Sequence, residues 1–173
     1  MGQPKQLIEI EGEPLVRRAV RMALEAGCGS VFVVLGSDAE AVESALAGLT
    51  VVTVLNAGWE AGMASSIGAG ISALPENTKA VLLLTCDQPA VDRGFLVGLL
   101  AAHSADPERT IGSAYANTVG IPALFPRSSF EALKGLPGDR GARQMLENEN
   151  VLSLPLPNGE LDLDTPEDLA RIQ

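Results

Sequence analysis

The sequence is poor in cysteine and in long apolar runs, and each shortage excludes a class of protein. The two cysteines, Cys28 and Cys86, are too few for a disulfide framework, and the N-terminus shows no basic-then-apolar signal segment. No apolar stretch approaches the roughly 18 residues that a transmembrane helix needs. We therefore expect the 173 residues to form one globular domain in a reducing cytoplasm.

Basic residues are also scarce, and this argues against nucleic acid or an anionic membrane as partner. Acidic residues outnumber basic ones by 22 to 12, which gives a formal net charge of -10 and no basic patch. Lysine occurs only at Lys5, Lys79 and Lys134. A lone lysine near a chain start is usually a surface residue, but its compact ammonium group is also a common phosphate ligand.

Several catalytic signatures are missing. The single histidine, His103, lies in a predicted helix without a partnered nucleophile, and there is no Gly-x-Ser-x-Gly elbow. The glycine spacing gives neither a Walker loop nor a convincing Gly-x-Gly-x-x-Gly after a strand. Cys28 and Cys86 are too far apart for a local metal knuckle, which makes a zinc site improbable.

Compact apolar runs alternate with amphipathic stretches, the pattern of βα units in a parallel sheet. The apolar runs predict strands at 31–35, 51–55 and 81–85, and weaker strands at 110–115, 121–125 and 151–156. Helices are predicted at 14–26, after a Ser37/Glu40 capping box, from Ser65 or Ser66 to Leu74, at 92–103, 128–134 and 140–147, and from Thr165 onward. A turn is expected at Asn158-Gly159.

Asp87 is the first candidate functional residue, because it follows the predicted strand 81–85 at its carboxyl end. Ligands of open α/β sheets bind at that edge, and a carboxylate there is suited to Mg²⁺. Asp162 and Asp164 are candidates for a second carboxylate, two residues apart on one face of an extended segment. The plain alternatives are that Asp87 is an ordinary turn residue and that Asp162 and Asp164 belong to a solvated acidic run near the C-terminus.

Taken in order along the chain, the sequence resembles the molybdenum cofactor nucleotidyltransferases, most closely their cytidylyltransferase branch. The resemblance rests on six segments. Four of them are Met1-Gly2-Gln3-Pro4-Lys5-Gln6-Leu7, the loop and helix start at 56–67, Cys86-Asp87-Gln88-Pro89, and Leu163-Asp164-Thr165-Pro166-Glu167-Asp168-Leu169. The other two are Gly120-Ile121-Pro122 and Gly138-Asp139-Arg140-Gly141-Ala142-Arg143. It implies a three-layer, Rossmann-like α/β fold with a mostly parallel, mixed sheet. Proline before Lys5 is similar to the cytidylyl branch, whereas the guanylyl branch tends to have aspartate there.

The resemblance also implies a reaction and its residues. A CMP group would pass from CTP to the phosphate of molybdopterin with release of pyrophosphate, and no general base is required because the acceptor is already anionic. Asp87 and Asp164 would hold Mg²⁺, and Lys5 would neutralise charge on the triphosphate. The nucleotide would lie against four residues: Gly58, Gly62, Ser65 and Ser66.

On the acceptor side, the residues implied by the resemblance are Gly120, Pro122, Asp139 and Arg143. Two departures from the family pattern stand out. Ile121 replaces a histidine that is common between the glycine and the proline, which bears on the exact acceptor. The first strand and its glycine-rich phosphate loop are missing before Met1, so the single domain of residues 1–173 is expected to be shortened at its front, at a cost to activity.

Other functions remain open at this point. Within the same class, the acceptor could be a sugar phosphate or phospholactate, or the donor could be GTP. A non-catalytic molybdenum-cofactor-binding protein, with transient contact to a molybdoenzyme or its chaperone, is an alternative from a different class. A receiver-like signalling domain fits less well, because it would place its acidic cluster early and its lysine late.

Overall fold

A computed structural model describes residues 4–138, 141–147, 150–163 and 168. The chain begins with the 3₁₀ turn η1 (Lys5–Leu7) and a hairpin of two short antiparallel strands, β1 (Glu9–Ile10) and β2 (Glu13–Pro14). Glu11 and Gly12 occupy the turn at φ of 53° and 78°, the backbone of a type I′ turn. This hairpin was not predicted, because strands of two residues show no periodicity in the sequence.

A first sheet joins β3 (Phe32–Leu35) and β4 (Val52–Leu55) in parallel, with α1 (Leu15–Ala26) before it and α2 (Ala39–Ala45) between its strands. These elements confirm the predictions for 14–26, 31–35 and 51–55. The Ser37/Glu40 capping box is wrong. Asp38, in the left-handed conformation at φ 55°, takes the N-cap position, and no side chain caps this helix.

A second sheet has the order β5-β7-β6-β8, built from β5 (Ala80–Leu83), β6 (Ile111–Tyr115), β7 (Thr118–Pro126) and β8 (Leu152–Pro155). β7 is antiparallel to both β5 and β6, whereas β6 and β8 are parallel. The weaker predicted strands at 110–115 and 121–125 therefore form one hairpin. The sheet is mixed, and its strands β5, β6 and β8 end at the same edge.

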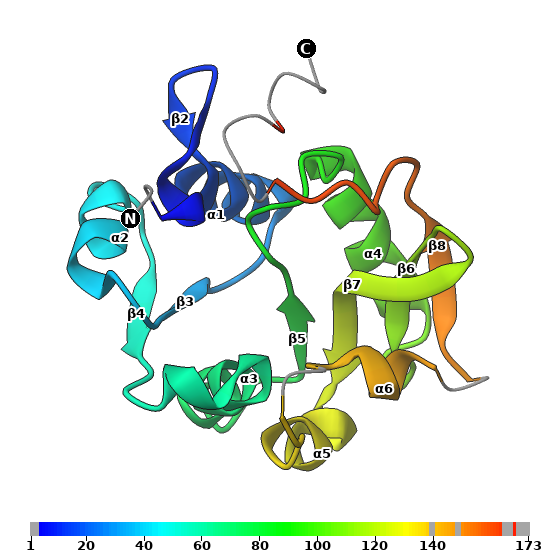
Figure 1. The fold of residues 1–173 in the computed structure, drawn as a ribbon. Helices are drawn as coiled ribbons and strands as arrows, with labels where there is room; N and C mark the ends of the chain where they lie inside the picture. Colours follow the sequence, from blue (N-terminus) through cyan, green and yellow to red (C-terminus); the bar gives the residue numbers. More distant parts are fainter. Residues whose placement is uncertain (1–3, 139–140, 148–149, 164–167, 169–173) are drawn as a thin grey trace.

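The helices cover these sheets on two sides. α3 (Met63–Ser72) contacts α5 (Phe130–Lys134), and α1 contacts α4 (Arg93–Ala105), whose N-cap Asp92 accepts a hydrogen bond from the amide of Phe95 at 2.7 Å. The remaining short elements are η2 (Trp59–Ala61), η3 (Arg127–Ser129) and α6 (Arg143–Leu146). Figure 1 shows β3 and β4 on one side of the molecule, β7, β6 and β8 on the other, and β5 between them. The predicted three-layer α/β fold with a mixed sheet is confirmed.

The two sheets share their covering helices but not their hydrogen bonds. Among the described residues, β3 pairs only with β4 and β5 only with β7, so each strand has one unpaired edge. Both strands nevertheless lie between the same two helices. On the α1 side, Val20 shares one apolar cluster with Val33, and Met22 shares another with Leu82. On the α3 side, Ile71 shares a third cluster with Val81, and a β-carbon at Gly70 would lie 3.1 Å from Val34.

The remaining predictions divide between the described residues and those outside them. None of the described helices combines the length and apolar character that crossing a membrane requires. The predicted turn is present, since Asn158 has a φ of 60° and its carbonyl accepts a hydrogen bond from the amide of Leu161 at 3.1 Å. The helix predicted from Thr165 lies outside the described residues.

Candidate functional site

Asp87 lies at the carboxyl edge of the second sheet, in the turn that leads from β5 to α4. Pro89 follows two residues later, and the guanidinium of Arg18 from α1 donates to its carbonyl at 3.3 Å. The turn is thus fastened to α1 as well as to β5. The predicted place of Asp87 at a strand's carboxyl end is confirmed, although three residues separate it from the last residue of β5.

Lys5 and Asp87 form an ion pair across 82 positions of sequence, with 2.6 Å between Lys5 Nζ and Asp87 Oδ2. The Asp87 side chain is only 13% exposed, whereas that of Lys5 is 39% exposed. Burial would raise the pKa of Asp87, but hydrogen bonds from Lys5 and Thr85, together with the Lys5 charge, outweigh it and lower that pKa. Asp87 is therefore a largely buried carboxylate whose negative charge is compensated by the ammonium group of Lys5.

Cys86, next to Asp87, does not supply a reactive thiolate. Burial, reinforced by the neighbouring Asp87 charge, raises the pKa of its thiol to about 11. Its side chain packs with Ile8, Leu15 and Leu163 instead. This agrees with the prediction that Cys86 is a small apolar residue.

The acidic C-terminal segment reaches the same turn. The amide of Leu163 donates to the carbonyl of Asp87 at 2.8 Å, and the Leu163 side chain is buried at 1% exposure. Asp162, the residue before Leu163, is exposed. Burial raises the pKa of the Tyr115 phenol, and the charge of Asp162 raises it further. Asp164, the predicted second metal ligand, lies outside the described residues. The residue before it, Leu163, is hydrogen-bonded to the backbone of Asp87.

The donors at this edge fit a hard divalent cation. Mg²⁺ usually takes one or two carboxylates and completes its shell with water and substrate phosphates. Asp87 supplies one carboxylate that already holds a cation, Lys5, at 2.6 Å. The described residues contain no group of three or more metal-ligating side chains.

The loop after β4 is held by one buried amide, that of Asn56, which is 7% exposed. Its Nδ2 donates to the hydroxyls of Ser65 at 2.9 Å and Ser66 at 3.1 Å, and its Oδ1 accepts from the amide of Gly58 at 3.0 Å. All the polar groups of this amide are satisfied within the loop. The four predicted nucleotide-binding residues, Gly58, Gly62, Ser65 and Ser66, are thus brought together around Asn56.

The two serines do not cap the helix as predicted. α3 begins at Met63 with Gly62 as N-cap, so Ser65 is its third residue. The Ser65 hydroxyl lies 2.8 Å from the carbonyl of Gly62 and 3.1 Å from that of Gly58. Gly62 has a φ of 97°, a conformation open to glycine and strained for other residues, and this allows the helix to start earlier than the serines suggested.

The structure brings only some of the predicted acceptor-side residues close to one another. Gly120 lies under Tyr115, since a β-carbon there would overlap the Tyr115 hydroxyl, and Pro122 is fully buried in β7 after a cis peptide bond. Arg143, at the start of α6, is exposed; burial raises the pKa of Tyr115, and the Arg143 charge acts in the opposite direction. Asp139 lies outside the described residues. Pro122 is positioned to shape this region and not to touch a ligand.

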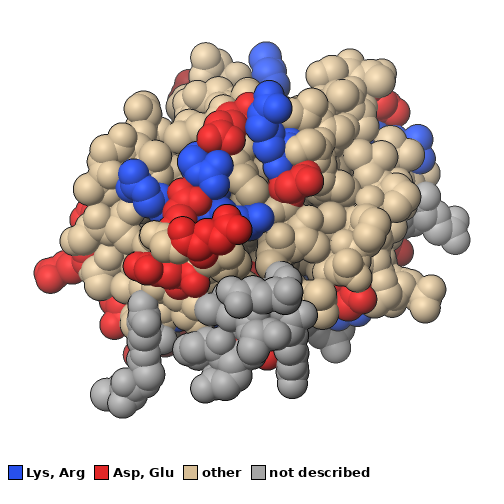
Figure 2. Space-filling view, turned by 90° about the horizontal axis from the view of Figure 1, so that it is seen from above, with Lys and Arg blue, Asp and Glu red and all other residues tan. Residues whose placement is uncertain are grey.

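The surface above this edge carries both charge signs. Figure 2 views the molecule from the side toward which β5 points in Figure 1, and there basic and acidic side chains are interspersed among the described residues. One such network joins Arg21 to Glu13 at 2.7 Å and to Glu25 at 3.2 Å.

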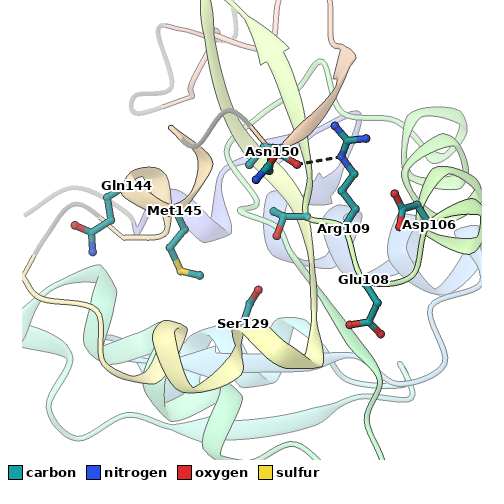
Figure 3. Close-up of a pocket in the computed structure, with 9 residues that line it drawn as sticks. Asp106, Glu108, Arg109, Ser129, Gln144, Met145 and Asn150 are labelled. Atoms are coloured by element: carbon teal, nitrogen blue, oxygen red, sulfur yellow. Dashed lines mark hydrogen bonds between the residues drawn. The ribbon is translucent and has the colours of Figure 1, made fainter.

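A separate pocket of about 510 Å³ lies at the opposite edge of the second sheet, where β6 and β8 begin. Its lining includes Glu108, Ser129 and Met145, and Arg109 crosses it to donate to the carbonyl of Asn150 at 3.0 Å (Figure 3). Asp87 follows the carboxyl end of β5, so this pocket is not part of the candidate site.

Three polar residues near the site were not predicted as functional: Asn56, Gln88 and Tyr115. Asn56 directly follows β4, the same strand-end signal that pointed to Asp87, and could have been found in that way. Gln88 follows Asp87 in the chain but was given no role. Tyr115 ends β6, in a stretch too irregular in sequence for its edge of the sheet to be predicted.

The fold and the charged edge at Asp87 together define the chain as a nucleotidyltransferase. More narrowly, residues 1–153 match the MobA-like NTP transferase domain, and the chain belongs to that family. This confirms the predicted nucleotidyltransferase family and enzyme class.

Similar proteins span nearly the whole chain. It is 30% identical to the nicotine blue oxidoreductase of Paenarthrobacter nicotinovorans, over 98% of this chain and 87% of that protein. It is 29% identical to a probable molybdenum cofactor guanylyltransferase of a Nostoc species, over 100% of this chain and 84% of that protein. The crystal structure of Rv0371c from Mycobacterium tuberculosis in complex with manganese is 26% identical, covers 98% of this chain and 90% of its own, and superposes with a TM-score of 0.81.

Proposed function

We propose that this protein is a Mg²⁺-dependent cytidylyltransferase that transfers CMP from CTP to the phosphate of molybdopterin. An oxygen of the acceptor phosphate attacks the α-phosphorus of CTP. The bond from that phosphorus to the bridging oxygen of the β-phosphate breaks, and pyrophosphate leaves. The observation that carries the proposal is the Lys5–Asp87 pair, 2.6 Å long, at the carboxyl edge of the sheet.

The roles of the charged residues follow from the charge of the substrates. Two anions must approach each other, so the protein's main contribution is to position them and to screen their repulsion. Asp87, together with Asp164, would hold Mg²⁺, which when bound supplies positive charge at the phosphates. Lys5 exchanges its contact with Asp87 for one with the triphosphate, where its ammonium group adds to the screening.

The Asn56 network supports the nucleotide-binding part of the proposal. Because Asn56 ties Ser65, Ser66 and Gly58 together in the free protein, the loop has its shape before the nucleotide arrives. A loop ordered in advance does not have to be ordered on binding, and so favours affinity. Gly120 and Arg143, near Tyr115, would lie on the acceptor side of the same edge, with Asp139 in the neighbouring segment.

A molybdenum-cofactor acceptor and a divalent metal have support from the relatives, whereas the choice of CTP rests on the proline before Lys5. The Nostoc relative is named as a probable guanylyltransferase for the molybdenum cofactor, and the mycobacterial structure holds manganese. GTP as donor, or a sugar phosphate or phospholactate as acceptor, are the neighbouring possibilities. A cytoplasmic location, and transient contact with a molybdoenzyme or its chaperone that receives the product, belong to the same proposal.

Residues 1–173 are proposed to be one nucleotidyltransferase domain whose sheet accepts a further strand between β3 and β5. The unpaired edges of these strands and their shared helices, α1 and α3, support this. Such a strand would join the two sheets and satisfy both edges. A chain extended at its front by an apolar strand and a glycine-rich loop should melt at a higher temperature and turn over faster than the present chain; equal melting temperatures would contradict the added strand.

The reaction is tested by measuring pyrophosphate release from CTP, GTP and UTP, each with and without molybdopterin and with the metal removed by chelation. The proposal predicts release only with CTP, molybdopterin and Mg²⁺ together. Release from GTP alone, or with a sugar phosphate in place of molybdopterin, would correct the substrate. Molybdopterin binding without turnover would favour a carrier, and oxidation of a reduced nicotinamide cofactor without pyrophosphate release would favour the activity named for the Paenarthrobacter relative.

A further inference from the structure

The amide of Gln88 is the one buried polar side chain between Asp87 and the C-terminal acidic segment for which the proposed reaction gives no task. Gln88 is 4% exposed. Its Nε2 donates to the carbonyl of Gly159 at 3.0 Å, and its Oε1 lies 3.4 Å from the hydroxyl of Thr85. A single side chain thus connects the turn after β5 to the loop after β8, 71 residues further along the chain.

The loop that Gln88 holds is the one that delivers the acidic segment. Its turn is closed by bonds from the amide of Gly159 to the carbonyl of Leu156 and from the amide of Leu161 to that of Asn158, both at 3.1 Å. Four residues after Gly159, the Leu163 amide bonds to the carbonyl of Asp87 at 2.8 Å. The loop is therefore attached to the Asp87 turn at two points, through the Gln88 side chain and the Asp87 backbone.

Tyr115 closes this arrangement from the side of β6. Its ring lies so close to Gly159 that a β-carbon there would come within 2.7 Å of Tyr115 Cδ1, and its hydroxyl lies over Gly120. Burial raises the pKa of the same phenol, and the nearby Gln88 amide acts in the opposite direction. The position of Gly159 is thus fixed by Gln88 on one side and by the aromatic ring on the other.

We infer that Gln88 is a positioning residue for the cation site: by holding Gly159, it keeps the Leu163 amide on the carbonyl of Asp87 and so sets the affinity of the Asp87 turn for a divalent cation. Gln88 touches no substrate in this role. Groups that orient metal ligands commonly contribute tenfold or more to metal affinity. The inference rests on the proposed function, because it assumes that Asp87 binds a cation.

The test is a Mn²⁺ titration followed by electron paramagnetic resonance, combined with hydrogen exchange at the Leu163 amide, on the full chain. Gln88→Met keeps the length of the side chain but removes both bonds. Gly159→Ala pushes the same loop away from Tyr115 while leaving Gln88 intact, and serves if the first variant does not fold. Arg109→Leu is the control, since it removes a side-chain bond to a distant carbonyl at the opposite edge of the sheet.

We expect Gln88→Met and Gly159→Ala each to raise the dissociation constant for Mn²⁺ by about tenfold and to speed exchange at Leu163, with Arg109→Leu unchanged in both. Faster exchange with wild-type Mn²⁺ affinity would overturn the inference, because Gln88 would then be only structural. If the affinity depends on Asp87 but not on Gln88, this inference alone fails. If it does not depend on Asp87 either, the proposed function fails with it.

Discussion

The two polar regions at the edges of the sheets, the loop around Asn56 and the turn around Asp87, are built on opposite principles. The Asn56 loop consists of neutral hydrogen bonds between 2.8 and 3.1 Å, all made within one stretch of chain. The Asp87 turn includes charged groups, Lys5 on the Asp87 carboxylate and Arg18 on the carbonyl of Pro89, and it joins segments from both ends of the chain. The first region is held by neutral groups alone, whereas in the second a carboxylate is paired with a cation.

Under the proposed function, the two halves of the nucleotide site are prepared before binding in different ways. Neutral bonds that need not break hold the Asn56 loop in one shape. A buried carboxylate needs a compensating cation, and in the proposed reaction Lys5 is that cation until substrate and metal bind. The two regions should therefore respond to mutation in different ways: the Asn56 loop through stability and nucleotide affinity, the Asp87 turn through metal binding and rate.

The largest effect is expected for Asp87→Ala, which removes the carboxylate of the Asp87 turn. Mg²⁺-dependent pyrophosphate release should fall by about 10³-fold, because charge stabilisation at the phosphates is lost. The rate is measured in the chain extended at its front. Glu108→Ala, which removes an exposed carboxylate at the opposite edge, is the control and should keep the wild-type rate. A near-normal rate for Asp87→Ala would contradict the assignment of Asp87 as a Mg²⁺ ligand.

Lys5→Met should separate the two tasks of the lysine. Without nucleotide, the variant should bind Mn²⁺ several-fold more tightly, because the metal no longer competes with an ammonium group for Asp87. With nucleotide, its KM for CTP should rise, because one positive charge is missing at the triphosphate. Lys79→Met is the matched control, as it removes another lysine at the start of β5. Unchanged Mn²⁺ affinity in Lys5→Met would show that Lys5 and the metal do not compete for Asp87.

Asn56→Ala should break the preformed loop. Leaving the Gly58 amide and two hydroxyls without their partner should lower the free energy of unfolding by about 2 kcal/mol, measured by urea denaturation. KM for CTP should rise with little change in kcat, since the loop binds the nucleotide and does not touch the reacting atoms. Ser72→Ala removes a hydroxyl from the same helix outside the loop and should change neither quantity. A fall in kcat at constant KM would contradict the prediction that the Asn56 loop acts on nucleotide binding and not on the rate.

The smallest effect is expected for an ion pair outside both regions, that of Glu13 and Arg21. The hydrogen bond from Arg21, aided by its charge, lowers the pKa of Glu13. The pair's contribution to stability is therefore present above the unfolded-state pKa and is lost as the pH falls through the lower folded-state value. The difference in unfolding free energy between wild type and Glu13→Gln should be below about 1 kcal/mol at pH 7 and vanish on acidification. A difference that grew on acidification would contradict the sign.

Much of the fold could be predicted because its strands are continuous apolar runs and α1 has a clear apolar stripe. The misses have local physical causes. The β1–β2 hairpin is too short to show a pattern, and its turn depends on the positive φ of Glu11 and Gly12. The N-cap positions of α2 and α3 are occupied by residues with positive φ, Asp38 and Gly62, and not by the serines nearby.

The site was predicted residue by residue but not as an arrangement. Spacing and resemblance singled out Lys5 and Asp87, yet nothing in a separation of 82 residues indicates that they contact each other. The same holds for Gln88, whose partner Gly159 lies 71 residues away. Contacts between distant segments follow from how the sheet is assembled, and sequence periodicity contains no information on that.

The central claim, that Asp87 is the cation ligand of a nucleotidyl-transfer site, is tested most directly by a Mn²⁺ titration of the wild type and of Asp87→Asn. The substitution keeps the size of the side chain and removes only its charge. The account predicts saturable Mn²⁺ binding by the wild type and a loss of at least about tenfold in affinity for Asp87→Asn. Equal affinities in the two proteins would contradict it.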